Sequence, residues 1–152
     1  MKKIEITAFE LAQRFVGIKE LPGSGDSHQV MAFLTLDNSW PDHDEVPWCS
    51  AFVNYVCWML RLPRSKSLAA RSWLLIGSAV QVGYAEVGYD IVILKRGGQN
   101  EPGPEVLDAK GHVGFFAGTE GEDVLVLAGN QNNAVNIQRF PLAQILGIRR
   151  IY

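Results

Sequence analysis

One of the two cysteines in this sequence stands where a thiol becomes reactive. Cys49 follows Pro47-Trp48 and begins the most strongly patterned helical segment. Its sulfur is therefore expected near the unpaired N–H groups at a helix N-terminus, a setting that lowers the pKa of a thiol and favours the nucleophilic thiolate. Cys57, in the apolar middle of the same helix and about 12 Å away at helical rise, fits an inert core thiol with no disulfide to Cys49.

A cysteine nucleophile needs a nearby imidazole to take up its proton. Two of the three histidines, His28 and His43, fall in a predicted helix and in an acidic loop, where surface positions are expected. His112 instead opens an apolar strand at residues 111–116, where a polar residue can face a cleft. The sequence therefore predicts His112 as the base.

A third group must orient the imidazole. A hairpin of residues 111–118 and 124–132, joined by a five-residue loop, would oppose His112 to Asn130. Directly opposed side chains lie on one face of a sheet with Cβ atoms about 4.5–5.5 Å apart. This register predicts Asn130 as the orienting residue and places Gln131 on the opposite face, whereas a loop shorter by one residue would oppose His112 to a glycine.

The elements that must position these residues change character halfway along the chain. Thr7 and Glu10 fit a capping box that begins a first helix, which apolar spacing extends through Ile18 to a stop at residues 21–23. Further helices are expected from a cap at Asp26 or Ser27, over residues 49–61 and, more briefly, over residues 68–75. Strands are expected at residues 89–94, 113–117, 124–128, 135–140 and 147–152.

This order of elements predicts an α+β fold in which N-terminal helices pack on a C-terminal antiparallel β-sheet. The 152 residues are expected to form a single catalytic domain, residues 1–152. A stretch rich in Gly and Pro interrupts the strands, and it predicts a mobile loop at about residues 96–110.

The overall charge excludes some functions. The 14 Lys and Arg residues against 16 Asp and Glu residues leave a net charge of −2, so no general attraction to nucleic acid or an anionic membrane is expected. The sequence shows no apolar run of membrane-spanning length and no conventional secretory signal. We expect a protein made in the cytoplasm, without stable membrane insertion, and a monomer by default.

A group of acidic residues precedes the nucleophile, and a solvated loop is its expected structure: Asp37, Asp42, Asp44 and Glu45. Calcium is an alternative because it prefers such oxygen ligands, but the spacing of a calcium-binding loop is missing. His28 and His43 do not have a zinc-site spacing either. The sequence therefore predicts no metal and no cofactor, with calcium the less favoured possibility.

Three segments resemble the CHAP and NlpC-type cysteine peptidases and amidases that cut bacterial peptidoglycan: Val46-Pro47-Trp48-Cys49-Ser50-Ala51-Phe52-Val53-Asn54, Gly111-His112-Val113-Gly114-Phe115-Phe116 and Gly129-Asn130-Gln131. The likeness spans most of the chain and is greatest to compact phage and prophage members that serve as endolysins. It implies a papain-like fold. Many CHAP members have a Glu two residues before an Asn in the strand after the histidine, whereas this chain has Ala128.

The resemblance implies a peptidoglycan hydrolase with catalytic Cys49, His112 and Asn130, and with Trp48 and Gln131 contacting substrate. An endopeptidase is slightly preferred over an N-acetylmuramoyl-L-alanine amidase, acting on the wall after release through a holin or another export route. Two alternatives stay open: an antibacterial amidase toxin with the same chemistry, delivered into another cell, and a catalytically idle wall-binding module.

Overall fold

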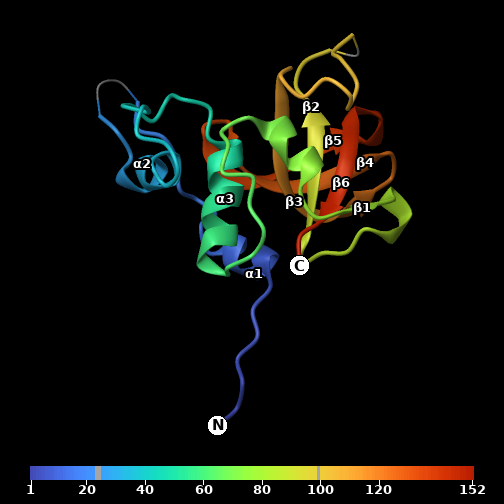
Figure 1. Ribbon diagram of the computed structural model, residues 1–152, viewed down its shortest axis with the longest axis horizontal. Helices are drawn as coiled ribbons and strands as arrows, with labels where there is room; N and C mark the ends of the chain where they lie inside the picture. The colour runs from blue at the N-terminus through green and yellow to red at the C-terminus, as the bar shows by residue number, and fades with distance from the viewer. Residues whose placement is uncertain (23–24, 99) are drawn as a thin grey trace.

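The computed structural model of the protein describes residues 1–22, 25–98 and 100–152. Figure 1 shows the α-helices gathered on one side of the sheet and the N-terminal residues extending away from the body. In chain order, with 3₁₀ helices labelled η, the elements are α1 (Ala8–Gln13), α2 (His28–Leu34), α3 (Cys49–Met59), η1 (Ala70–Leu75), β1 (Ser78–Val80), η2 (Val82–Tyr84), β2 (Asp90–Lys95), β3 (Gly111–Glu120), β4 (Asp123–Gln131), β5 (Ala134–Pro141), η3 (Leu142–Gln144) and β6 (Ile145–Arg150).

The six strands form one antiparallel sheet in the order β1-β6-β2-β3-β4-β5. The last strand, β6, lies inside the sheet and pairs with β1 on one side and β2 on the other. The predicted α+β architecture, with helices first and an antiparallel sheet second, is confirmed. No helix of the described residues has the length and apolar character needed to cross a membrane.

The main core lies between α3 and the sheet. Apolar residues at helical spacing place one face of α3 against β3 and β4, and this face includes the fully buried Phe52, Val53 and Val56. Phe52 meets Phe115 of β3 edge to face, with ring centroids 6.1 Å apart. Burial of these side chains holds the helix that carries Cys49 in a fixed position on the sheet.

The opposite face of the sheet is covered as well. Val92 and Leu94 of β2 are fully buried there, while Ile91 and Ile93 face α3. Val80 and Phe140, from the two edge strands β1 and β5, pack against this same second cluster, so the sheet curls around it. Burial on both faces explains why β2 is a continuous apolar run instead of an alternating one.

The first helix is shorter than predicted. The capping box is confirmed, with Glu10 N donating to Thr7 Oγ1 at 3.1 Å and Thr7 N donating to Glu10 Oε2 at 2.8 Å. The predicted extension through Ile18 is wrong, because the chain turns at Gly17 and then binds the edge strand β5, with Val135 N donating to Ile18 O at 2.8 Å. Sheet hydrogen bonds replace the helical ones. The predicted stop at Gly23 lies outside the described residues.

The other predicted elements differ mainly at their ends. Ser27 is the N-cap of α2, and its side chain accepts a hydrogen bond from Val30 N. Helix α3 ends at Met59, two residues before the predicted end, and the segment at 68–75 contains the 3₁₀ helix η1. Strand β1 was not predicted, because its three residues carry no alternating apolar pattern.

We predict that Gly129→Ala destabilises the protein by about 1–3 kcal/mol, because overpacking a core forces its side chains out of place. A Cβ at this position would lie 2.5 Å from the Trp48 ring and 3.0 Å from Phe52 Cβ. Urea unfolding measures the change. Gly83→Ala is the matched control, since a Cβ there has no neighbour within 4 Å, and it should change stability by less than about 0.5 kcal/mol. Equal stability of the two variants would contradict the close packing of Trp48 and Phe52 against Gly129.

Candidate active site

Cys49 is the first residue of α3, as the sequence predicts. The first hydrogen bond of the helix runs from Phe52 N to Trp48 O at 3.0 Å, so the N–H groups of residues 49–51 have no acceptor within the helix. These groups and the helix dipole favour negative charge at the Cys49 sulfur. The side chain is 3% exposed, so the thiol lies at the floor of the site.

The imidazole of His112 lies against the Cys49 thiol. Burial alone raises the pKa of Cys49, but the hydrogen bond and positive charge of His112, with smaller contributions from Val113 N–H and Arg96, outweigh it and lower the pKa. Burial alone lowers the pKa of His112, but the hydrogen bond and charge of Cys49, assisted by Gln131, raise it. The two groups therefore stabilise each other as a thiolate and an imidazolium.

Gln131, and not Asn130, holds the imidazole. His112 Nε2 lies 3.0 Å from Gln131 Oε1. Gln131 Nε2 donates to Asn136 O at 2.8 Å, Asn136 Oδ1 at 3.0 Å and Val126 O at 3.3 Å, which fixes the amide with its oxygen toward His112. His112 Nε2–H must then be the donor, and Nδ1 is the nitrogen left for Cys49. The prediction of Asn130 as the orienting residue is wrong in this structure.

A bulge at each end of the hairpin explains why Gln131, and not Asn130, faces His112. The turn between β3 and β4 is Gly121-Glu122, not the predicted five-residue loop, and a shift after Phe116 restores the predicted pairing of Phe115 with Leu127. Beyond that pair β4 no longer follows the predicted pairing with β3. Between Ala128 and Gln131 it has one extra residue relative to β5, and Asn130 there has φ +58°. One extra residue reverses the side-chain alternation, so Gln131 faces His112.

Trp48 belongs to the core beneath the site. Its ring is fully buried and stacks on Phe33 with centroids 6.0 Å apart, while Nε1 donates to Glu20 Oε1 at 2.7 Å. The structure thus contradicts the prediction that Trp48 contacts substrate. Gln131, the other predicted substrate contact, is buried and uses its amide to hold His112. Burial raises the pKa of Glu20, and the Trp48 N–H opposes this effect.

Two cavities flank the Cys49–His112 pair. The first, of about 160 Å³, lies over the thiol and is lined by Pro47, Cys49, residues 68–70, Arg96 and residues 109–111. The second, of about 320 Å³, lies beside the imidazole and is lined by residues 95–97, His112, residues 130–132, Gln138, Phe140, Pro141 and Gln144. Asn130 therefore lines the site without holding the histidine. Together the cavities provide open space on both sides of the Cys49–His112 pair.

The segment at 96–110 forms a wall of the site and is held by a buried arginine that sequence reasoning missed. Among its described residues, all except Gln99, it contains no helix or strand. Arg71 is fully buried, and its guanidinium donates at 2.7–2.9 Å to four carbonyl oxygens, those of Pro102, Gly103, Val106 and Lys110. Such a clamp leaves no signal in the sequence, because all its acceptors are backbone groups.

The loop on the other side of the thiol is tied to α3 itself. Asn54 Nδ2 donates to Ser65 Oγ and Ser67 O, and Asn54 Oδ1 accepts from Lys66 N at 2.9 Å. Ser50 Oγ donates to Ser67 O at 2.6 Å and accepts from Trp73 Nε1 at 2.9 Å. These bonds lead the chain from the end of α3 back to its start, where residues 68–70 line the thiol cavity.

The acidic residues before the nucleophile do not form one solvated loop. Asp44 is 1% exposed and accepts N–H bonds from Leu21 at 3.0 Å and Ser27 at 2.7 Å, so that part of the prediction is wrong. Asp37 binds Arg64 at 2.8 Å. Within residues 1–22, 25–98 and 100–152 no group of His, Cys, Asp and Glu is arranged to hold a metal ion. His28 and His43 lie at the surface, as expected.

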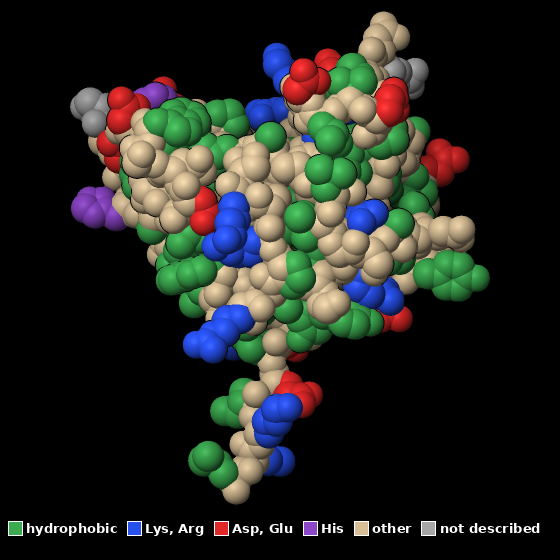
Figure 2. Space-filling view, viewed as in Figure 1, with side chains coloured by type: hydrophobic (Ala, Val, Ile, Leu, Met, Phe, Trp, Pro, Cys, Tyr) green, Lys and Arg blue, Asp and Glu red, His purple; other side chains and the backbone are tan. Residues whose placement is uncertain are grey.

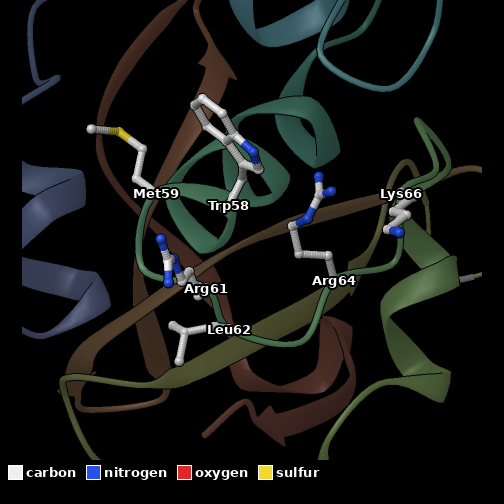
Figure 3. A pocket seen from close by; sticks show the side chains of 6 residues that line it. All are labelled: Trp58, Met59, Arg61, Leu62, Arg64 and Lys66. Carbon is white, nitrogen blue, oxygen red and sulfur yellow. The ribbon is translucent and has the colours of Figure 1, made fainter.

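A larger hollow, of about 660 Å³, lies at the other end of α3 and is lined by Trp58, Met59, Arg61, Leu62, Arg64 and Lys66 (Figure 3). The eleven residues of α3 place it roughly 15 Å from Cys49. Its lining contains neither a thiol nor an imidazole. Figure 2 shows basic and acidic side chains in several separate groups on the face seen there. The Cys49 end of α3 is therefore the candidate active site.

The chain is similar in fold to a solved structure, NlpC1 from Trichomonas vaginalis. The two superpose with a TM-score of 0.56 at 17% sequence identity, over 98% of this chain and 46% of that chain. The chain thus spans about half the length of this neighbour. No protein-family model matches the chain, and no curated protein matches it. The similarity establishes an NlpC-type, papain-like fold.

We predict that Gln131→Leu shifts the pH dependence of Cys49 alkylation by iodoacetamide upward by about one unit. Without the Gln131 hydrogen bond the pKa of His112 falls, so the imidazolium loses its proton at a lower pH than in the parent. The thiolate then loses its stabilising cation, and the lowered pKa of Cys49 returns toward 9.0. Asn130→Gly, which keeps the positive φ, is the control and should leave the profile unchanged. The reverse pattern would reinstate Asn130 as the orienting residue.

We predict that Arg71→Met lowers the free energy of unfolding by about 2–4 kcal/mol and exposes the segment at 96–110 to protease, because the four carbonyls that the buried guanidinium binds lose their donor. Urea unfolding and mapping of the first cleavage sites by mass spectrometry measure the two effects. Arg61→Met, at an exposed position, is the matched control. If both variants were as stable and as protease-resistant as the parent, the clamp would not hold this wall of the site.

Proposed function

We propose that the protein is a cysteine hydrolase that cleaves an amide bond of bacterial peptidoglycan. The observation that carries this proposal is the Cys49 thiol at the start of α3, paired with His112, whose far nitrogen is held by Gln131. Peptidoglycan as substrate is supported by the sequence resemblance to CHAP and NlpC-type enzymes and by the NlpC-type fold.

In the proposed reaction the Cys49 thiolate attacks the carbonyl carbon of the amide. The negative charge that develops on the carbonyl oxygen is stabilised by Cys49 N–H, which has no acceptor within the helix. His112 donates its Nδ1 proton to the departing amine, and the amine leaves a thioester on Cys49. His112 then takes a proton from water, which attacks the thioester and releases the acid.

Gln131 acts through His112 in this scheme. As a neutral amide it fixes the ring orientation and the Nε2–H tautomer without adding a negative charge. A Cys–His pair that is already charged needs only this orientation, because the thiolate itself balances the imidazolium. The proposed triad is therefore Cys49, His112 and Gln131, and the reaction needs no metal or cofactor.

For the bond and the biological role, we propose a peptide bond of the stem peptides and an endolysin-like function of a monomer. Both proposals rest on the resemblance to compact phage members. A sugar–peptide amidase, a delivered antibacterial toxin and an idle wall-binding module are the alternatives. The fully formed thiol–imidazole pair argues against the idle module, because a binding surface needs no activated thiol.

We predict that the parent protein releases soluble fragments from purified peptidoglycan and that Cys49→Ala releases none, as mass spectrometry of the products would show. Cys57→Ala is the matched control and should retain activity, because burial raises the pKa of the Cys57 thiol to about 12 and keeps it unreactive. New ends within the stem peptides would identify an endopeptidase, whereas intact stem peptides with a free N-terminal alanine, together with glycan that carries free lactyl carboxylates, would identify an amidase. Equal release by parent and Cys49→Ala would exclude the mechanism, and binding without release by the parent would identify the wall-binding module.

A further inference from the structure

Arg96 is the basic residue that the two cavities of the active site share. It follows the last residue of β2 and lines both the cavity over Cys49 and the cavity beside His112. Lys95 lines the second cavity and Lys110 the first, whereas neither lining contains an aspartate or a glutamate. Among the described residues the two linings therefore contain three cations and no carboxylate, and the Glu101 carboxylate lies just outside them, beside Gly97.

The charge of Arg96 is free to meet a ligand. Among the described residues no carboxylate forms an ion pair with its guanidinium, and the side chain is exposed. It is also close enough to act on the reacting groups, because its positive charge lowers the pKa of both Cys49 and His112, behind the larger effects of burial and of their pairing. Arg71, the nearby buried arginine, cannot play this part, since four carbonyls occupy its donors.

We propose that Arg96 forms a carboxylate-binding subsite beside Cys49, so that the site prefers substrates with a free carboxylate near the bond that is cut. A planar guanidinium binds a carboxylate through two parallel hydrogen bonds, which also orients the group. The clamp at Arg71 supports the subsite, because it fixes the segment that leaves β2 at Arg96. The substrate preference rests on the proposed function, whereas the carboxylate site itself does not.

Two small alkylating agents test the subsite without any substrate. Iodoacetate and iodoacetamide differ only in a carboxylate against a carboxamide, and in both the Cys49 thiolate forms the S–C bond while iodide leaves with the bonding electrons. The ratio of their rate constants cancels any change in the pKa of Cys49, since both reagents consume the same thiolate. Mass mapping of the labelled peptide separates Cys49 from Cys57, which burial keeps protonated.

We expect Arg96→Gln to lower the iodoacetate-to-iodoacetamide ratio at Cys49 about fivefold relative to the parent, the effect of one unit charge at contact distance in water. Arg96→Lys should retain part of the preference, because it keeps the charge and loses the two-point contact. Arg61→Gln removes the same charge from the far end of α3 and should leave the ratio unchanged. An unchanged ratio in Arg96→Gln, or an equal fall in Arg61→Gln, would overturn the proposal.

The same variants connect the subsite to the reaction on peptidoglycan. Sacculi treated with carbodiimide and ammonia carry carboxamides in place of free carboxylates, and the parent should cut them more slowly than untreated sacculi. Arg96→Gln should cut the two preparations at similar rates. If no protein cut either preparation, the proposed function would fail while the alkylation ratio still decided the subsite. A parent that cut both equally would overturn the substrate preference.

Discussion

The contact between Cys49 and His112 sets the requirements that the surrounding structure meets. Both side chains are buried, at 3% and 7% exposure, and burial opposes the charge of each. A thiolate and an imidazolium persist in such a place only when each compensates the other and further dipoles support them. Those dipoles are the free N–H groups at the start of α3, Val113 N–H and the amide of Gln131. They stabilise the charged pair only if α3 is held at a fixed position on the sheet.

The packing of α3 on β3 and β4 fixes that position. Polar contacts then hold the two segments that border the site. Apolar residues of α3 fix the height of Cys49 over the sheet, while Ser50 and Asn54 on the same helix tie down the loop that borders the thiol. Arg71 holds the opposite wall through backbone carbonyls alone. The site is thus built on a rigid helix and strand, with its borders made by two irregular segments whose geometry is set by buried donors.

Much of this arrangement was predictable where local rules apply. The capping box at Thr7, the helix beginning at Cys49, the strands other than β1 and the α+β class follow from apolar periodicity and capping residues, and the structure confirms them. The selection of Cys49 and His112 as partners rests on the chemistry of their positions, and the structure brings the two together. The errors arise where long-range contacts override local preference, as where residues after Gly17 join the edge of β5 instead of continuing α1.

The sequence by itself determined where most helices and strands lie and which thiol begins a helix, because these properties depend on neighbours within a few turns of the chain. The tertiary structure alone decided which residue holds His112, the burial of Trp48 and Asp44, and the clamp at Arg71. A bulge of one residue exchanges the two faces of a strand, and no pattern in the local sequence records whether it forms. Likewise, Arg71 binds only backbone carbonyls, which every residue carries. Which carbonyls it binds is therefore decided by the conformation of the folded chain and not by the residue types.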